Sequence, residues 1–219
     1  MEKEKKFMAE IVVDNTALIK KEDARVYRTK RDLADALEAL LNERNFDDLS
    51  VKDITDKALI SKNTFYNNFQ DKNELLQFVF TRYLLKIKER INPLLKSYKP
   101  YPLRKREFFK KVIKEIVDFF LDDMPLPMGK MAKNDISGTF FRDFSIFTRQ
   151  AMEHMVAEYP FLLGKTLDEV ILVNFYSGGI ANLIYYAYRN ELQIERKKIC
   201  SDIFRLVYPA LCDSNLILG

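Results

Sequence analysis

The chain of 219 residues contains no tryptophan, a single histidine, two cysteines and only six glycines. A metal or catalytic site built around His154 needs partner residues at suitable spacing, and we find none in the sequence. Ser145, Ser177 and Ser201 lack the surroundings of a nucleophile elbow, and no glycine-rich phosphate loop is present. We therefore expect no enzyme activity, no metal and no cofactor.

Targeting signals are missing as well. The opening segment MEKEKKFMAE mixes charges and lacks the apolar core of a signal peptide, and no run of about 18 apolar residues follows. Cys200 and Cys212 form no metal pattern, and if one helix ran through both they would lie about 18 Å apart, too far for a disulfide. We expect reduced core thiols in a cytoplasmic protein that does not enter a membrane.

The composition that remains favours helices. Hydrophobic residues make up 47% of the chain, which with so few glycines suits an all-α protein with a substantial core. The net charge of +4 is compatible with any soluble protein. Periodic apolar residues and helix-stop signals predict two short helices after Ser50 and Ser61. They also predict longer helices over Tyr27–Asn42, Lys72–Ile91 (ending before Pro93), 104–123, 138–158, 166–189 and Glu195–Tyr208 (stopping at Pro209).

One further absence points to a function. Residues 57–70 contain no Asp or Glu, although 32 residues of the chain are acidic. A phosphate backbone repels carboxylates and attracts Lys, Arg and neutral donors, so an acid-free polar helix is what nucleic-acid binding requires. The alternative is a plain helical hairpin with a solvated polar face.

The residues around this segment fit a helix-turn-helix. Ser50 is a suitable N-cap, and Leu59-Ile60 makes the turn before Ser61 caps a second short helix. In that helix Phe65 and Phe69, four residues apart, face inward and leave the polar side chains on the other faces. A short turn followed by a polar second helix is the arrangement in which a recognition helix enters the major groove.

Residues from about Arg28 to Tyr83 resemble the DNA-binding domain of the tetracycline-repressor (TetR) family of regulators. The most specific feature is the Phe-Tyr-x-x-Phe-x-x-Lys pattern, and the segments "FDDLSVKDIT" and "ISKNTFYNNFQDKNELL" carry the rest. The chain departs from the family at Leu59, where Gly is common, at Asn45, also a frequent Gly, and at Asn68, a frequent His. The resemblance covers about a quarter of the chain.

Together these patterns predict three regions: an N-terminal extension (1–24) with no assigned role, a three-helix DNA-binding head with a helix-turn-helix (25–72), and a larger helical ligand-binding and dimerisation domain (73–219). Side chains at the front of the recognition helix are expected to reach base edges. Others hold phosphates, aided by the free N–H groups where the Lys72 helix begins. The predicted base-edge residues are Lys62, Asn63 and Thr64, next to Ser61; the phosphate residues are Ser50, Tyr66, Asn67 and Lys72; and Arg28 and Lys30 precede the domain and reach the neighbouring backbone or minor groove.

The last two helices are apolar on more than one face, which predicts burial on several sides. Thr166-x-x-Glu169 is expected to be the capping box of the first of them. Gly178-Gly179 in its middle admits either a partner helix or a ligand close to the backbone. The resemblance implies that both helices form a homodimer interface; the alternative is an ordinary monomer core.

Flexible Met and flat aromatic side chains between the two ends of this domain predict an adaptable pocket. Each of them can instead be a core residue. In the resembled family a small ligand usually enters this domain and shifts the spacing of the two DNA heads, which implies a small apolar or aromatic ligand here. The predicted lining consists of Met124, Phe140, Phe144, Phe147, Met152, Met155 and Tyr176.

The sequence thus favours a sequence-specific transcriptional regulator, with repression as the family's common mode. It would act as a homodimer on a palindromic operator in double-stranded DNA. The alternative class is a helical small-molecule-binding protein or enzyme whose head does not read DNA.

Overall fold

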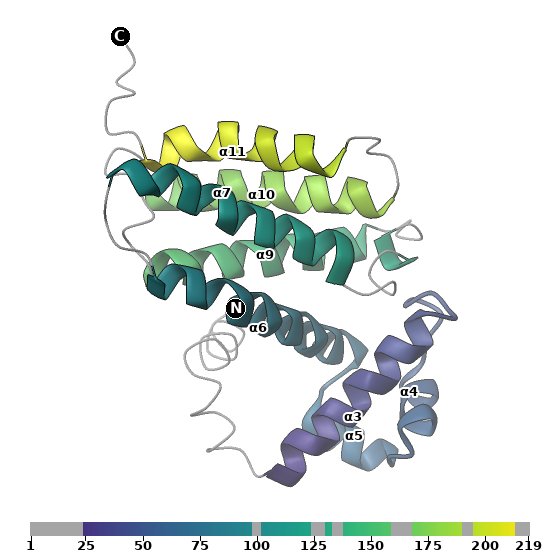
Figure 1. Ribbon diagram of the computed structural model, residues 1–219. Coiled ribbons are helices and arrows are strands. Elements are labelled where there is room, and N and C mark those ends of the chain that lie inside the picture. The colour runs from purple at the N-terminus through teal and green to yellow at the C-terminus, as the bar shows by residue number, and fades with distance from the viewer. Residues whose placement is uncertain are drawn as a thin grey trace. The chain divides into compact units, whose positions relative to one another are not determined.

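The computed structural model describes residues 24–97, 102–123, 130–132, 138–158, 168–189 and 195–212. Within these ranges every regular element is a helix, which confirms the all-α prediction (Figure 1). The longer elements are α3 (Ala24–Leu41), α4 (Val51–Ala58), α5 (Lys62–Asn68), α6 (Lys72–Ser97), α7 (Pro102–Asp118), the π-helical turn η1 (Phe119–Asp123), α9 (Thr139–Glu158), α10 (Glu169–Tyr188) and α11 (Arg196–Cys212).

The chain divides into two compact units, which we name the head unit and the cavity unit. The head unit comprises residues 1–85 and 126–143, and the cavity unit comprises residues 86–125 and 144–219. The divisions fall within α6 and within α9.

The core of the head unit is built from one face of α3. Leu33, Leu37 and Leu41 recur at helical spacing and are completely buried. Helices α4 and α5 pack against this face and contribute Ile54 and Phe65, which are also completely buried. Burial of these five side chains excludes water from the junction of α3, α4 and α5. The packing of the side chains fixes the angles at which the three helices cross.

The core of the cavity unit joins helices that are distant in the sequence. Its buried cluster includes Phe109 and Val117 of α7, Leu172 of α10, and Phe204 and Val207 of α11. Helices α7 and α11, which are far apart in the sequence, pack directly against each other. This core therefore depends on long-range contacts rather than on local pairing.

Two predicted helix ends are wrong because proline does not end the helix. Pro93 lies inside α6, which continues to Ser97, and Pro209 lies inside α11, which continues to Cys212. An interior proline costs about 3 kcal/mol through a lost hydrogen bond and a clash. In α6 the residues on both sides of Pro93, Ile91 and Leu94, pack on the core of the cavity unit, and that burial offsets the cost.

The start of α10 also differs from the prediction. The helix begins at Glu169, and its cap is Asp168, whose carboxylate accepts hydrogen bonds from the backbone N–H groups of Val170 and Ile171 at 2.9 and 3.2 Å. The expected cap, Thr166, lies outside the described residues. By length and composition alone α10 is apolar enough to cross a membrane, although the sequence has no uninterrupted apolar run of that length; core helices of soluble proteins meet the same test.

Candidate nucleic-acid interface and apolar cavity

The N-terminus of α4 is held by a reciprocal capping box. The Ser50 hydroxyl accepts a hydrogen bond from the Asp53 N–H at 3.2 Å, while the Asp53 carboxylate accepts from the Ser50 N–H at 2.8 Å. Arg44 forms an ion pair with the same carboxylate at 3.0 Å. The hydrogen bonds from Ser50 and then the Arg44 guanidinium hold the pKa of Asp53 well below its ordinary value. The predicted cap is confirmed. The Ser50 hydroxyl, which was also predicted to contact a phosphate, is used in this cap.

The turn between α4 and α5 depends on one residue with left-handed backbone geometry. Leu59 has φ 57° and ψ 37°, and it is the only non-glycine residue with positive φ among the described ranges. Its N–H donates to the Asp56 carbonyl, and the N–H of Ile60 donates to the Thr55 carbonyl at 3.0 Å, so two carbonyls of the last turn of α4 are satisfied. The departure from glycine at this position therefore leaves the turn intact.

Helix α5 separates its apolar and polar side chains as predicted. Phe65 and Phe69 are 0% and 2% exposed, their ring centroids lie 5.9 Å apart, and Phe69 contacts Phe78 of α6. The Ser61 hydroxyl caps the helix by accepting from the Thr64 N–H at 3.1 Å. The polar faces are open: Ser61, Lys62, Asn63, Tyr66 and Asn67 are exposed, and Thr64 is half-buried.

Lys72 has a structural role that the sequence did not predict. Its ammonium donates hydrogen bonds to the backbone carbonyls of Phe46, Asp47 and Leu49 at 2.8, 3.2 and 2.9 Å. The same nitrogen lies 4.6 Å from the centre of the Phe46 ring. Burial lowers the pKa of Lys72. An ammonium has three donors, and all three serve the loop before α4, which favours this intramolecular role over the predicted phosphate contact.

The start of α6 is already capped by acid. The Asp71 carboxylate accepts from the N–H groups of Asn73 and Glu74 at 2.8 and 2.9 Å, and Glu74 accepts from the Gln70 N–H. Two donors that the sequence suggested for a phosphate are therefore used within the chain, and two carboxylates stand beside them. These contacts favour an internal cap over the predicted phosphate contact at this helix start.

Arg28 and Lys30 lie inside the first two turns of α3 rather than ahead of the domain. Arg28 is exposed and Lys30 is half-buried. Both are therefore carried on a helix that the buried leucines anchor to the head core. This limits their reach toward DNA to the length of their own side chains.

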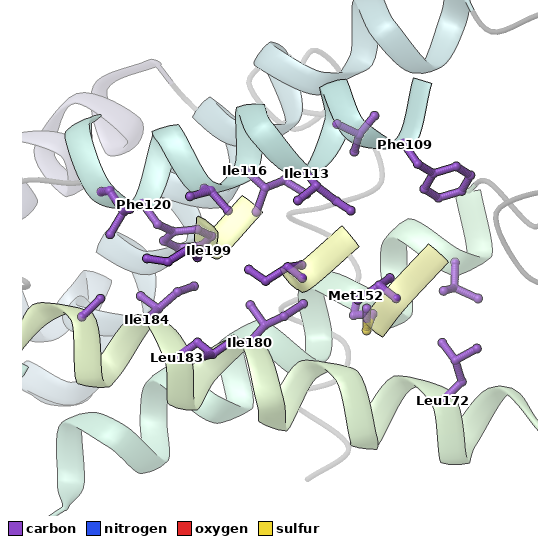
Figure 2. Close-up of a pocket in the computed structure, with 17 residues that line it drawn as sticks. Phe109, Ile113, Ile116, Phe120, Met152, Leu172, Ile180, Leu183, Ile184 and Ile199 are labelled. Atoms are coloured by element: carbon purple, nitrogen blue, oxygen red, sulfur yellow. The ribbon is translucent and has the colours of Figure 1, made fainter. Parts of the chain in front are cut away.

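The cavity unit contains a cavity of about 110 Å³ with a wholly apolar wall (Figure 2). Helix α7 and η1 contribute Phe109, Val112, Ile113, Ile116, Val117, Phe120 and Leu121. Helix α9 contributes Met152 and Val156. The remaining wall comes from Leu172, Ile180, Leu183, Ile184 and Ala187 of α10 and from Ile199, Ile203 and Val207 of α11.

Among the predicted pocket residues that the structure describes, Met152 alone lines this cavity. Phe144 and Phe147 are 0% and 2% exposed and stack on each other in the core, and Phe140 belongs to the head unit, where it packs on Phe80. Tyr176 packs against the core of the cavity unit, and its hydroxyl donates to the Leu206 carbonyl. Met124 and the side chain of Met155 lie outside the described part of the structure.

The wall residues of α10 and α11 lie on the two helices that the sequence analysis described as apolar on more than one face. That signal predicts burial but does not distinguish a packed core from a hollow one, because helices packed closely or loosely show the same periodicity. The choice of Met and Phe as lining residues rested on side-chain type, whereas aliphatic residues on α7, α10 and α11 form most of the wall.

Helices α10 and α11 also present an apolar face to the outside of the chain. Val170, Ile171, Phe175 and Leu206 are 68, 67, 73 and 69% exposed. Gly178 and Gly179 are exposed on α10, and a Cβ added at either would meet no described atom within 4 Å beyond its chain neighbours and the backbone of its own helix. The glycines are therefore not required by packing within the chain.

Residues 29–79 match the sequence model of a family described as "Bacterial regulatory proteins, tetR family". This range contains α4, α5 and the first turns of α6. A search of curated proteins found no match.

Solved structures share the fold over most of the chain. A putative TetR-family transcriptional regulator from Syntrophomonas wolfei is 12% identical over 87% of this chain and 98% of its own, with a TM-score of 0.57. The TetR-family repressor AlkX from Dietzia sp. is 15% identical over 83% and 94%, with a TM-score of 0.56. The dihydroxyacetone kinase operon activator DhaS is 17% identical over 84% and 96%, with a TM-score of 0.52.

Proposed function

We propose that this chain, which carries a TetR-family DNA-binding domain in residues 29–79, is a cytoplasmic transcriptional repressor that binds a palindromic operator as a homodimer and responds to a small apolar ligand. The observation that carries the proposal is the exposed, acid-free face of α5, held in place by the buried Phe65 and Phe69. A face of this kind favours phosphate and base contacts because no carboxylate on it opposes the DNA charge.

The side chains of α5 that are predicted to contact base edges or phosphates are accessible enough to do so. Lys62 and Asn63 lie in the first turn and are exposed, so their side chains can reach base edges when the N-terminal end of the helix enters the groove. Thr64 is half-buried, and its methyl group can touch a thymine. Tyr66 and Asn67 stand further along the exposed surface, where we propose that they contact phosphates.

Selection from a random library of duplex DNA, followed by sequencing of the bound fraction, tests the central claim. We expect a palindrome whose half-sites are separated by about one helical turn. Asn63→Ala should change the preference at one position of each half-site, whereas Tyr66→Ala should weaken binding to all sequences. Absence of any enriched sequence, with and without candidate ligands, would contradict the proposal.

Dimerisation through α10 and α11 is supported by their exposed apolar face. From Val170 to Tyr188 the helix carries no charged residue. In an interface with two-fold symmetry, residues near the axis meet their own copies, so an uncharged face avoids like-charge repulsion. The exposed Phe175 and Ile171 would supply apolar burial there.

A matched pair of substitutions tests this interface. Ile171→Glu places a charge on the proposed face, and Ile146→Glu places the same charge on the exposed surface of α9, where the side chain is 38% exposed. Sedimentation equilibrium should show that Ile171→Glu dissociates the dimer while Ile146→Glu does not. Equal behaviour of the two variants would place the interface elsewhere.

The regulatory sign needs its own experiment, because similar structures include both a repressor and an activator. We expect transcripts from promoters that carry the selected palindrome to rise when the gene is deleted. A fall would assign activation and leave the DNA-binding proposal unaffected.

A second candidate function is a small-molecule-binding protein whose head does not read DNA. The apolar cavity favours it, since a cavity of about 110 Å³ can hold a ligand regardless of what the head does. Ligand binding without any sequence enrichment in the DNA selection would support this candidate.

A further inference from the structure

The residues that line the cavity are spread along the length of α10. Figure 2 shows Phe120 and Ile184 at one end and Phe109 and Leu172 at the other. The lining residues Leu172 and Ala187 of α10 lie fifteen positions apart, which corresponds to about 22 Å along a helix that rises 1.5 Å per residue. A volume of about 110 Å³ distributed over that length suits an extended chain better than a flat ring system.

Among the residues that the structure describes, the wall offers no hydrogen-bonding group. Their lining side chains are all apolar, and they expose no polar atom on the wall. The volume is several times the roughly 10–15 Å³ that one water needs, yet water binds well only where it finds polar partners. A ligand that carries a charge or a hydroxyl group in its middle would leave that group unpaired, which is strongly unfavourable.

The wall is also stiff. Isoleucine and valine supply most of it, including Ile113, Ile116, Ile180 and Ile199. Such β-branched side chains hold one preferred rotamer in a helix, so they do not readily rearrange around ligands of different shape. Met152 is the one methionine among the described residues of the wall, and its side chain is flexible. The cavity should therefore discriminate between ligands by their shape.

We infer that the cavity binds an unbranched alkyl chain, with any polar group of the ligand confined to a chain end. Polar groups of the protein do occur beyond the wall: at the Phe120 end the Tyr188 hydroxyl donates to the Phe120 carbonyl at 2.8 Å. The inference rests on the ligand-regulated function proposed above and names the chemical class of its ligand. It replaces the adaptable, aromatic-lined pocket expected from the sequence.

Two isomeric alcohols test this inference. 1-Nonanol has its hydroxyl at a chain end and 5-nonanol has it in the middle, while composition and size are the same. Binding can be followed through the methyl resonance of ¹³C-labelled Met152, with Met131, a buried residue of the head unit, as the internal reference. We expect 1-nonanol to bind about tenfold or more tightly than 5-nonanol, because only the latter buries an unpaired hydroxyl.

Two variants with the same chemistry locate the binding site. Ala187→Leu adds bulk to the cavity wall and should weaken 1-nonanol binding, whereas Ala157→Leu adds the same bulk at an exposed position of α9 and should not. Naphthalene serves as the flat aromatic probe.

Equal binding of the two alcohols, tighter binding of naphthalene, or a similar effect of both variants would each overturn the inference. None of these readouts involves DNA. If the alkyl-binding tests fail and the DNA selection enriches a palindrome, the proposed regulatory function still holds. If the DNA selection fails and 1-nonanol binds as expected, the alkyl-binding site still holds.

Discussion

The helix-turn-helix of the head unit and the cavity wall of the cavity unit differ in the range of the contacts that form them. In the head unit the capping contacts of α4 and α5 join residues three positions apart, from Ser50 to Asp53 and from Ser61 to Thr64. The cavity wall is built from helices that are distant in the sequence, and two of them, α7 and α11, pack directly against each other. Local contacts give a precise recognition surface, whereas distant contacts between long helices leave room for a cavity.

The largest expected effect comes from removing one buried phenylalanine from each unit. Phe65 and Phe144 are both completely buried, and replacing either with Ala should cost about 3–5 kcal/mol. Because the chain has no tryptophan, hydrogen exchange is the appropriate measurement. We expect Phe65→Ala to deprotect α4 and α5, and Phe144→Ala to deprotect α9 and α10. If each substitution deprotected both units equally, the units would unfold together and the contrast would be lost.

Substitutions of Lys72 and Lys62 distinguish a lysine that stabilises the head unit from one that is proposed to contact DNA. Lys72→Met removes the ammonium that three carbonyls accept from and should cost about 1–3 kcal/mol of head stability. DNA affinity should be measured at several salt concentrations and calculated for the folded fraction of the protein. The slope of log affinity against log salt concentration should then be the same as in the unsubstituted protein. Lys62→Met should instead leave stability unchanged and weaken binding to the selected palindrome, because the Lys62 ammonium is proposed to reach a base edge. A lower slope for Lys72→Met would restore its predicted phosphate contact.

Leu59 tests whether the local geometry of the turn carries strain. Its positive φ is unfavourable for a side chain with a Cβ, and its side chain is 92% exposed and has little packing to lose. Leu59→Gly should therefore stabilise the head by about 1 kcal/mol, after the larger entropy of glycine in the unfolded chain is subtracted. Leu59→Ala keeps the strain and should give no gain. Denaturant titration of the three proteins makes the comparison.

The smallest expected effect concerns Gly179. Its helix position is exposed and has space for a Cβ, so Gly179→Ala should raise the stability of the dissociated chain by about 0.5–1 kcal/mol. If a second copy packs closely here, the same substitution should weaken dimerisation. Asn182→Ala, at another exposed position of α10, is the matched control and adds no bulk. Unweakened dimers of Gly179→Ala would show that the glycines do not mark a close helix contact.

The sequence predicted those features whose causes lie close together in the chain. The caps at Ser50 and Ser61 and the inward phenylalanines of α5 follow from spacings of three and four residues, and the structure confirms them. The resemblance to the TetR family, carried by the same segment, is confirmed as well. The residues proposed to contact DNA remain predictions.

Features that depend on residues distant in the chain were not predicted from the sequence. Lys72 meets carbonyls 23–26 positions earlier in the chain, and no periodicity reveals such a partner. Pro93 was expected to end a helix because the local cost is large, but burial of its neighbours offsets it. The cavity arises from how four helices fit together, so side-chain type alone selected Phe144 and Phe147 for a wall they do not form.

The apolar cavity also makes the cavity unit sensitive to hydrostatic pressure. Pressure favours the state of smaller total volume, and unfolding eliminates internal voids, so proteins with larger voids unfold at lower pressure. The cavity unit holds about 110 Å³ of apolar space, and a bound alkyl chain would occupy part of it. Compression should therefore loosen α7, α10 and α11 at a lower pressure in the empty protein than in the filled one.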